Sequence, residues 1–429
     1  MNVYIFTLGC KVNQYESQEI GEMFEKSGYT LLNEPANADI IIVNSCTVTA
    51  ESVRKVRQSV RHLKKISPNA FLILTGCASQ AEPEILSVLP EVNLMLGNRN
   101  NINIVALCEN ALKERGSSVN AHEEHETGES FQGLGITHFE GHTRAFLKIQ
   151  DGCDRFCSYC LIPKARGRSR SKPLSDIDRE LSELSKNGYG EIVFVGINLS
   201  DYGKGTPYSL PDALMLAEKY DSIKRVRLGS LEPDHITDEM IERLKNVTKL
   251  CPQFHISLQS GCNSVLKRMN RHYTREEYKA LADSLRSAFK DASVTTDILV
   301  GFPTESEADF CETVDFAKSI GFEKIHIFPY SKRNGTPAAA MPQLSNAIKD
   351  ERAKRLGAAA AEISKEYLLK QVGKTCEVLF ETEHPEFSEG YTKNYTPVRI
   401  YDGKDRKGKF LNILITDAGD DYCIGIEAT

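Results

Sequence analysis

Short apolar runs alternate with amphipathic stretches along the N-terminal quarter of the chain. Three runs, Asn2–Leu8, Ala38–Val43 and Ala70–Leu74, have the length and character of buried strands. Between them, Gln14–Ser27 repeats its apolar residues with the period of a helix, and Thr49–Lys65 has a helical pattern too. This alternation predicts a parallel sheet with helices on its faces.

A second series of strands and helices begins at residue 145. Its strand candidates are Ala145–Ile149, Glu191–Gly196, Lys224–Leu228, Gln253–Leu258, Val294–Val300 and Lys324–Phe328. Helical stretches separate them, among them Leu174–Lys186, Thr237–Asn246, Thr274–Ala288 and Glu307–Ser319. Repeated strand-then-helix units fit either a partial β/α barrel or a doubly wound sheet.

The pattern changes once more after a long helical stretch, Ser345–Gln371. Short strand candidates then follow closely on one another: Thr375–Phe380, Glu389–Asn394, Val398–Tyr401, Phe410–Ile415 and Tyr422–Ile426. This density predicts a small β-barrel. The polar, acidic segment 115–140 is expected to be a linker or an exposed loop. We therefore expect an α/β protein with an N-terminal parallel-sheet domain (1–115), a central domain of strand-then-helix units (140–363) and a C-terminal β-barrel (364–429).

Composition narrows the class of protein. The 429 residues are 41% hydrophobic and 26% charged, which excludes a mainly disordered or coiled-coil chain. No apolar run approaches the roughly 18 residues of a membrane helix, and the N-terminus lacks the pattern of a signal peptide, so a cytoplasmic protein without a membrane segment is expected. The net charge of −6 argues against binding nucleic acid through overall charge, but not against a local basic site.

Three of the 12 cysteines form a tight cluster. The segment Asp151-Gly-Cys-Asp-Arg-Phe-Cys-Ser-Tyr-Cys160 spaces Cys153, Cys157 and Cys160 as Cys-x3-Cys-x2-Cys. Thiolates suit both zinc and iron–sulfur clusters, but zinc usually takes a fourth ligand and none follows nearby. An iron–sulfur cluster with one open iron fits better. The polar residues of this loop make three coincidental core thiols the weaker alternative.

Three further cysteines share a structural position. Cys10, Cys46 and Cys77 each come just after the end of a predicted strand. If these strands are parallel neighbours, the thiols converge on the sheet edge where open α/β sheets bind ligands. Gly9 and Gly76 would let the backbone approach a cluster closely. Three buried core cysteines remain the alternative interpretation, and the other cysteines of the chain show no such pattern.

The cysteine motif with Tyr159 before its third thiol resembles the radical S-adenosylmethionine (SAM) enzymes. In that superfamily the open iron binds the cofactor, whose reductive cleavage gives a 5′-deoxyadenosyl radical, and the fold is a partial (β/α)6 barrel. A preceding cysteine triplet and a C-terminal β-domain further resemble the methylthiotransferases. The motifs that carry this resemblance are Gly9-Cys-Lys-Val-Asn-Gln14, Val43-Asn-Ser-Cys-Thr-Val48, Leu258-Gln-Ser-Gly261 and Asp297-Ile-Leu-Val-Gly-Phe-Pro-Thr-Glu305.

The resemblance implies two [4Fe–4S] clusters, one on Cys153, Cys157 and Cys160 and an auxiliary one on Cys10, Cys46 and Cys77. The segment Gly390-Tyr-Thr-Lys-Asn-Tyr395 is similar to the RNA-binding TRAM domain. Within the family the chain most resembles the tRNA branch that acts on N6-threonylcarbamoyladenosine at anticodon-loop position 37. The implied reaction replaces the hydrogen on carbon 2 of that base with a methylthio group.

The resemblance also implies cofactor contacts, mainly at the ends of barrel strands. These residues are Tyr159, Gly196, Asn198, Ser230, Glu232, Gln259, Gly301 and Glu305. The strand-end residues are explained about equally well as turn or capping residues. The family further implies a flavodoxin- or ferredoxin-type electron donor and a sulfur donor as partners.

Basic segments are candidates for binding the tRNA anticodon stem-loop. The run after the cysteine cluster carries Lys164, Arg166, Arg168, Arg170 and Lys172 and no acidic residue, which favours phosphate contacts. A second patch, Arg54, Arg57, Arg61 and Lys65, falls on one helix face. The C-terminal segment is acidic overall and would use a local strip of Lys404, Arg406, Lys407 and Lys409, with Tyr391 and Tyr395.

Three alternatives stay open at this point. The same chemistry acts on isopentenyladenosine in one branch of the family, where a Met typically precedes the Asn of the first motif. It acts on a ribosomal-protein aspartate in another, and the Lys-Val-Asn order argues against that branch. A non-enzymatic iron–sulfur protein that binds RNA or senses redox state would need no intact SAM site.

Overall fold

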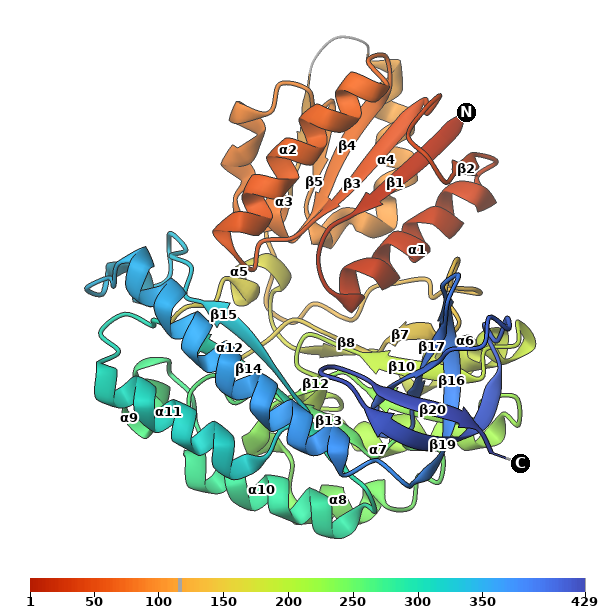
Figure 1. Cartoon of the computed structure of the whole chain (residues 1–429). Coiled ribbons are helices and arrows are strands. Elements are labelled where there is room, and N and C mark those ends of the chain that lie inside the picture. Colours follow the sequence, from red (N-terminus) through yellow and green to blue (C-terminus); the bar gives the residue numbers. More distant parts are fainter. Residues whose placement is uncertain (115–117, 429) are drawn as a thin grey trace.

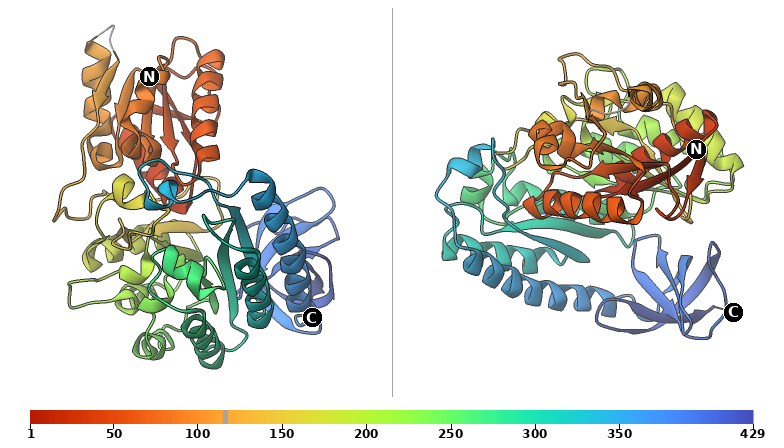
Figure 2. Two further views of the ribbon diagram at one scale, coloured as in Figure 1. Left: turned by 90° about the vertical axis from the view of Figure 1, so that its left-hand side faces the viewer. Right: turned by 90° about the horizontal axis from the view of Figure 1, so that it is seen from above.

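The computed structural model describes residues 1–114 and 118–428. Three bodies pack together: an N-terminal sheet domain, a β/α barrel beside it, and a small closed β-barrel at the C-terminus (Figure 1). The two further views in Figure 2 show the C-terminal barrel packed at one end of the long helix α12 (Asn346–Leu369). None of the described helices combines the length and the apolar character that crossing a bilayer requires.

The N-terminal domain is a parallel sheet in the order β2-β1-β3-β4-β5-β6. The sequence predicted its three long strands, β1 (Asn2–Thr7), β3 (Ile40–Ser45) and β4 (Phe71–Gly76). It did not predict the three short strands, β2 (Thr30–Leu32), β5 (Leu94–Leu96) and β6 (Val119–Ala121). Alternate residues of β3 face opposite sides, so Ile40 and Ile42 pack in one core and Ile41 and Val43 in the other. The first core contains α1 (Lys11–Lys26) and α4 (Ile104–Lys113), and the second contains α2 (Ala50–Ile66).

The segment expected to be a linker has a fixed path. Residues 115–117 lie outside the described residues, and β6 then adds an edge strand to the sheet. Farther on, the backbone N–H groups of Leu134 and Gly135 donate to Glu19 of α1, at 2.6 and 3.0 Å. Glu180 of α6 (Leu174–Lys186) accepts a hydrogen bond from the backbone N–H of Ile136 at 3.1 Å. Buried carboxylates therefore hold this connection between the two domains.

The central domain is a partial barrel of parallel strands, which decides between the two folds that the sequence allowed. The strands are β7 (Ala145–Lys148), β10 (Glu191–Val195), β11 (Arg225–Leu228), β12 (Ser230–Leu231), β13 (Gln253–Ile256), β14 (Ser293–Val300) and β15 (Lys324–Pro329). Gly229 separates β11, which pairs with β10, from β12, which pairs with β13. The two pieces therefore occupy one strand position of the six-unit barrel expected. Helices outside it include α6, α8 (Asp238–Leu244), α10 (Arg275–Ala288) and α11 (Glu307–Ile320).

The C-terminal domain is a closed barrel in the order β16-β17-β18-β20-β19, as the sequence predicted. Its strands are β16 (Thr375–Glu383), β17 (Ser388–Thr392), β18 (Pro397–Ile400), β19 (Phe410–Ala418) and β20 (Cys423–Glu427). The boundary expected at 363/364 falls inside α12, which runs through it without a break. Leu368, near the end of α12, belongs to the core of the closed barrel.

A buried ion cluster joins the two barrels. Glu191 of β10 has no solvent-exposed surface and accepts from Arg225 Nε at 2.5 Å and Arg227 Nε at 3.1 Å. Both arginines also donate to backbone carbonyls of the closed barrel, Arg225 to Tyr391 and Arg227 to Lys393. Burial alone would raise the pKa of Glu191, but its arginine neighbours lower it to about 2. The carboxylate is thus ionised and fixes the C-terminal barrel against β11.

We expect Glu191→Gln to destabilise the protein by about 3–5 kcal/mol, because it leaves buried arginines without their counter-ion. Urea unfolding followed by circular dichroism measures the change. Glu183→Gln, which breaks the exposed pair with Lys186, is the matched control and should cost less than about 1 kcal/mol. Equal effects of the two substitutions would contradict the role given to Glu191.

The same carboxylate predicts an acid transition. Its pKa is lower in the folded chain (about 2) than the ordinary 4.5. Its contribution is therefore complete above pH 4.5 and is lost as the pH falls toward 2. The Glu191→Gln variant should show a shallower loss of stability over this window.

Candidate active site

The first cysteine cluster lies in the loop between β8 (Gln150–Asp151) and α5 (Ile162–Arg166). This loop holds Cys153, Cys157 and Cys160, and the Cys160 backbone N–H donates to the Cys157 carbonyl at 3.0 Å. Burial, followed by the charge of Cys157, raises the pKa of Cys153 and Cys160 to about 12. Arg271 donates to Cys157 Sγ at 3.2 Å and to Glu232 at 2.5 Å, which ties the loop to the end of β12.

Gln150 holds the cysteine loop against the end of β10. Its carbonyl oxygen accepts from the backbone N–H groups of Ile197 and Asn198, at 2.9 and 2.8 Å. Its amide donates to the carbonyls of Asp151 and Gly152 and to Ser169. Gln150 could not be identified from the sequence, because a lone glutamine forms no recognisable motif.

The Asn198 side chain, in contrast, has no partner. It is 2% exposed, and neither its amide nitrogen nor its carbonyl oxygen forms a hydrogen bond with a described residue. Buried polar groups are nearly always hydrogen-bonded, and an exception in a protein without its ligand points to a ligand contact. The sequence analysis identified Asn198 as a candidate cofactor contact. Its unsatisfied amide groups support that interpretation.

Some of the other cofactor candidates line a cavity, and the rest have partners elsewhere in the barrel. Gly196 and Ser230 line a cavity described below, and Tyr159 packs edge-on against Phe302, with the ring centroids 6.4 Å apart. Gln259 has a positive φ of 66° and forms an isolated parallel bridge with Ile298 of β14. Glu305 accepts from the Gly301 backbone N–H at 2.7 Å and from Arg352 at 2.6 Å, and it is buried. Its carboxylate therefore closes the Gly301 turn, as a capping residue does.

The second cysteine set also converges. Cys10, Cys46 and Cys77 follow β1, β3 and β4, which are adjacent and parallel, so the three residues lie at one edge of the sheet. Close packing explains Gly9: it has a φ of +126°, and a Cβ there would lie 3.1 Å from the Cβ of Cys46. Gly76 likewise has a φ of +98° and no room for a side chain. The sheet edge thus presents three thiols, as the strand positions predicted.

One arginine connects the two cysteine sets. Arg166, at the end of α5, has no exposed surface and donates from Nε to Cys77 Sγ at 3.2 Å. Its other nitrogens donate to Glu16 at 2.7 and 2.9 Å and to Asp151 at 3.2 Å. The helix that follows the first cysteine cluster is therefore bonded directly to the second.

This arrangement corrects part of the RNA site expected from the basic run. Arg166 is committed to the interior, and Lys172 is 2% exposed, bonded to Glu180 and to Tyr15. Arg170 donates to the Arg166 carbonyl at 2.9 Å and is also largely buried. Only Lys164 and Arg168 of the five are exposed, with Arg168 over the exposed ring of Phe156, 4.6 Å from its centroid.

Burial also shows which of the other basic residues are available to contact RNA. On α2, all four residues of the predicted face are exposed, and Arg57 and Lys65 have no ion-pair partner among the described residues. In the C-terminal strip, Arg406 is 2% exposed and paired with Asp402 and Glu427, so it is not a free RNA contact. Lys404, Lys407 and Lys409 remain exposed.

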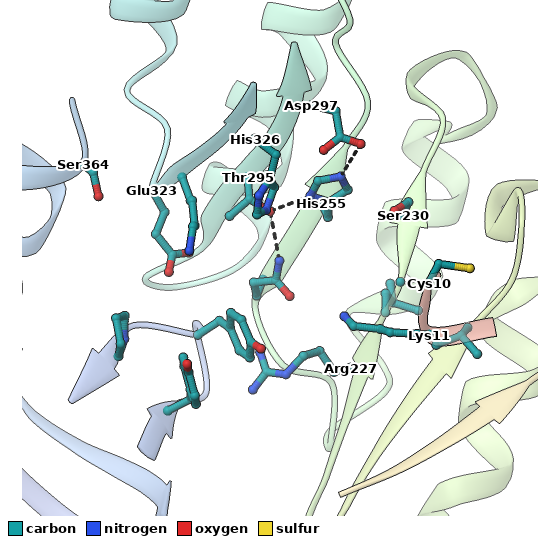
Figure 3. A pocket seen from close by; sticks show the side chains of 18 of the residues that line it. Cys10, Lys11, Arg227, Ser230, His255, Thr295, Asp297, Glu323, His326 and Ser364 are labelled. Carbon is teal, nitrogen blue, oxygen red and sulfur yellow. Dashed lines mark hydrogen bonds and ion pairs between the residues drawn. The ribbon is translucent and has the colours of Figure 1, made fainter. Parts of the chain in front are cut away.

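A cavity of about 680 Å³ lies where the three bodies meet (Figure 3). Its wall includes Cys10 and Lys11 of the N-terminal domain and Gly196 and Ser230 of the β/α barrel. The closed barrel contributes Tyr391 and Tyr395, whose rings stack with centroids 4.5 Å apart. His255 on the barrel wall contacts Asp297, and its ring is 5.7 Å from that of His326.

Comparisons with known proteins agree with this geometry. The model of the Radical SAM superfamily matches residues 147–317, and that of Uncharacterized protein family UPF0004 matches residues 2–97. A solved radical SAM methyltransferase, TsrM from Kitasatospora setae, has a similar fold, with a TM-score of 0.60, 13% identity and coverage of 79% of this chain and 77% of that one. The fold and the cysteine cluster thus define a radical SAM enzyme.

Similar sequences specify the family. A protein of Bacillus subtilis named threonylcarbamoyladenosine tRNA methylthiotransferase MtaB is 36% identical over 98% of this chain and 95% of its own length. The protein of that name from Thermotoga maritima is 41% identical over 88% and 86%. A tRNA-2-methylthio-N(6)-dimethylallyladenosine synthase of Clostridium novyi is 35% identical over 97% and 94%. This chain belongs to the methylthiotransferase family of radical SAM enzymes.

The family works with SAM and two [4Fe–4S] clusters, and the residues present here fit them. Each cysteine set offers three thiols without another bonding role that would exclude iron, and thiolates are the usual ligands of such clusters. The unpartnered amide of Asn198 lies at the strand end next to the first set. Cys153, Cys157 and Cys160 would hold one cluster, and Cys10, Cys46 and Cys77 the other.

We expect Asn198→Leu to leave folding stability nearly unchanged, because the lost amide makes no hydrogen bond in the free protein. SAM affinity, measured by equilibrium dialysis on the iron-loaded protein, should fall about tenfold. Gln150→Leu is the matched control, and it should lower stability because it removes several buried hydrogen bonds. If Asn198→Leu unfolded as readily as that control and bound SAM normally, the amide would be structural.

Proposed function

We propose that this enzyme converts N6-threonylcarbamoyladenosine at tRNA position 37 to its 2-methylthio derivative. The observation that carries the proposal is the shared cavity, because one space is bordered by the second cysteine set at Cys10 and by the barrel-strand ends at Gly196 and Ser230. A base in this space would lie beside Cys10 of the second set and beside the strand ends where cofactor contacts are expected. The similarity to proteins named threonylcarbamoyladenosine tRNA methylthiotransferase supports this choice of substrate.

When bound, the clusters and SAM would supply the deoxyadenosyl radical that removes the hydrogen on carbon 2 and the methylthio group that replaces this hydrogen. The chain contributes binding, orientation and the exclusion of water. Arg271 and Gln150 fix the first cysteine loop, and Arg166 fixes its distance from the second set. The stacked pair Tyr391 and Tyr395 offers an aromatic surface at the cavity wall for a base turned out of the anticodon loop.

The anticodon stem-loop would be held by cations that the structure leaves exposed. Lys164 and Arg168 lie beside the first cysteine loop, and Arg57 and Lys65 lie on α2. Phosphate contacts from such residues position an RNA without reading its sequence. The enzyme would further need a flavodoxin- or ferredoxin-type electron donor and a sulfur donor, and it would work in the cytoplasm.

Nucleoside mass spectrometry tests the proposal. Total tRNA is digested from cells that lack the gene, with and without the gene restored. Appearance of 2-methylthio-threonylcarbamoyladenosine on restoration is the expected result. A methylthio mark on isopentenyladenosine instead would keep the family and change the substrate, in line with the dimethylallyladenosine synthases that are also similar to this chain. No change in any nucleoside would direct attention to a ribosomal-protein aspartate, and then to a non-enzymatic role.

The two cysteine sets should fail in different ways when one thiol is removed. Cys157→Ala is expected to abolish both SAM cleavage and methylthio product, because the open-iron cluster loses a ligand. Cys46→Ala is expected to retain SAM cleavage and yield no methylthio product. Chromatography of 5′-deoxyadenosine alongside the nucleosides separates these outcomes, and Cys311→Ala, at an exposed thiol outside both sets, is the control. Normal product from Cys46→Ala would refute the role of the second set.

A further inference from the structure

Lys11 is a cation that faces the cavity without a counter-ion. It is the first residue of α1, directly after Cys10, and its side chain points into the cavity (Figure 3). Among the described residues, no carboxylate lies within ion-pair distance of its ammonium group and no acceptor hydrogen-bonds to it, and it lies 5.9 Å from the ring centroid of Phe146. The side chain is exposed to the cavity, so its donors are available to a ligand.

Two other basic residues of the cavity wall are paired with carboxylates, and a third, within the described part of the chain, is not. Arg227 is buried and bonded to Glu191 and to backbone carbonyls, and Arg399 is bonded to Glu389 at 2.6 Å. Lys324 has no ion-pair partner among the described residues, and it lies on the same face of β15 as His326. Lys11, Lys324 and His326 all line this cavity.

The acidic residues of the wall form no ion pair with Lys11 or Lys324 within the described part of the chain, although the charge of Asp297 acts on His326. Asp297 is paired with His255, and Glu389 with Arg399. Glu323 is 5% exposed and lies across the cavity from Lys11 in Figure 3. Lys11 and Lys324 thus leave an unmatched positive charge beside Cys10, which favours a negatively charged group on the ligand.

We propose that Lys11, with His326 and Lys324, forms a subsite for the carboxylate of an amino acid attached to N6 of the substrate adenine. The inference rests on the proposed function and deepens it, because it names the residues that select an anionic N6 group over a neutral one. Threonine joined through a carbamoyl group carries a free carboxylate, whereas a dimethylallyl group is uncharged. A bound carboxylate forms charge-assisted hydrogen bonds to such donors.

The position of Lys11 also fits the site of reaction. N6 and carbon 2 lie on the same Watson–Crick edge of adenine, on either side of N1. A carboxylate held by Lys11 therefore keeps this edge, with carbon 2, on the side of the cavity where Cys10 lies. The same contact would select the substrate and orient it toward the second cysteine set.

Two synthetic anticodon stem-loops test the subsite. One carries N6-threonylcarbamoyladenosine at position 37, and the other carries the threoninamide analogue, which has the same shape but no charge. Binding to the iron-loaded full-length enzyme is measured by fluorescence anisotropy, and product formation is followed by mass spectrometry. The wild-type enzyme should prefer the acid by about ten- to a hundredfold in both readouts, since hydrogen bonds to charged groups contribute about 1.5–3 kcal/mol.

Lys11→Gln should weaken acid binding by that factor and leave amide binding unchanged, so that the ratio approaches one. Lys11→Arg should restore the preference, and Lys324→Gln should reduce it partially. Lys279→Gln, on the outer helix α10, is the control. Iron content is measured for every variant, so that loss of a cluster is told apart from loss of the subsite.

The outcomes separate this inference from the proposed function. If the wild type methylthiolates the acid RNA but binds acid and amide equally, the subsite is refuted and the proposed function stands. If Lys11→Gln weakens both RNAs equally, Lys11 has a structural role and the subsite is likewise refuted. If the wild type binds neither RNA and modifies neither, the proposed function itself fails.

Discussion

The buried guanidinium of Arg166 is the contact on which the geometry of the active site depends. A charge without solvent is stable only with nearby counter-ions, and Glu16 and Asp151 supply them from two different domains. Lys148 completes the network by pairing with the same two carboxylates, each at 2.7 Å. Because each member of the network needs the others, the domains cannot slide past one another without exposing an unpaired charge. The separation of the two cysteine sets is therefore built into the interface.

A second network of the same kind sets the opposite wall of the cavity. Glu191 with its arginines bonds the β/α barrel to the backbone of the closed barrel, which places Tyr391 and Tyr395 on the cavity surface. The cavity is thus framed by ionic contacts at the domain interfaces, while apolar packing fills the interior of each domain. This division suits a site that must admit a polar, charged nucleotide. Charged interfaces leave spare donors at their margins, and Lys11 is one of them.

Most of the fold could be predicted from long apolar runs, but the short strands could not be predicted. The strands β2, β5 and β6 each have three residues, too few for a periodic pattern. The convergence of Cys10, Cys46 and Cys77 was predictable because parallel strands place their ends on one edge. The fate of Arg166 and Lys172 was not, because their partners Glu16 and Glu180 come from helices whose approach the local sequence does not encode. Asn198 and Lys11 were recognised because their polar groups have no hydrogen-bond or ion-pair partner among the described residues. Only a structure can show this.

The long helix α12 has a mechanical consequence. Near its start, Arg352 is bonded to Glu305, and Lys349 packs against Gly301 at the end of β14. Near its end, Leu368 lies in the core of the closed barrel. A single helix is stiff along its axis, so these two anchor points behave as the ends of a lever. Because α12 is continuous between these two points, the position of the closed barrel and the shape of the Gly301 turn are linked through one helix.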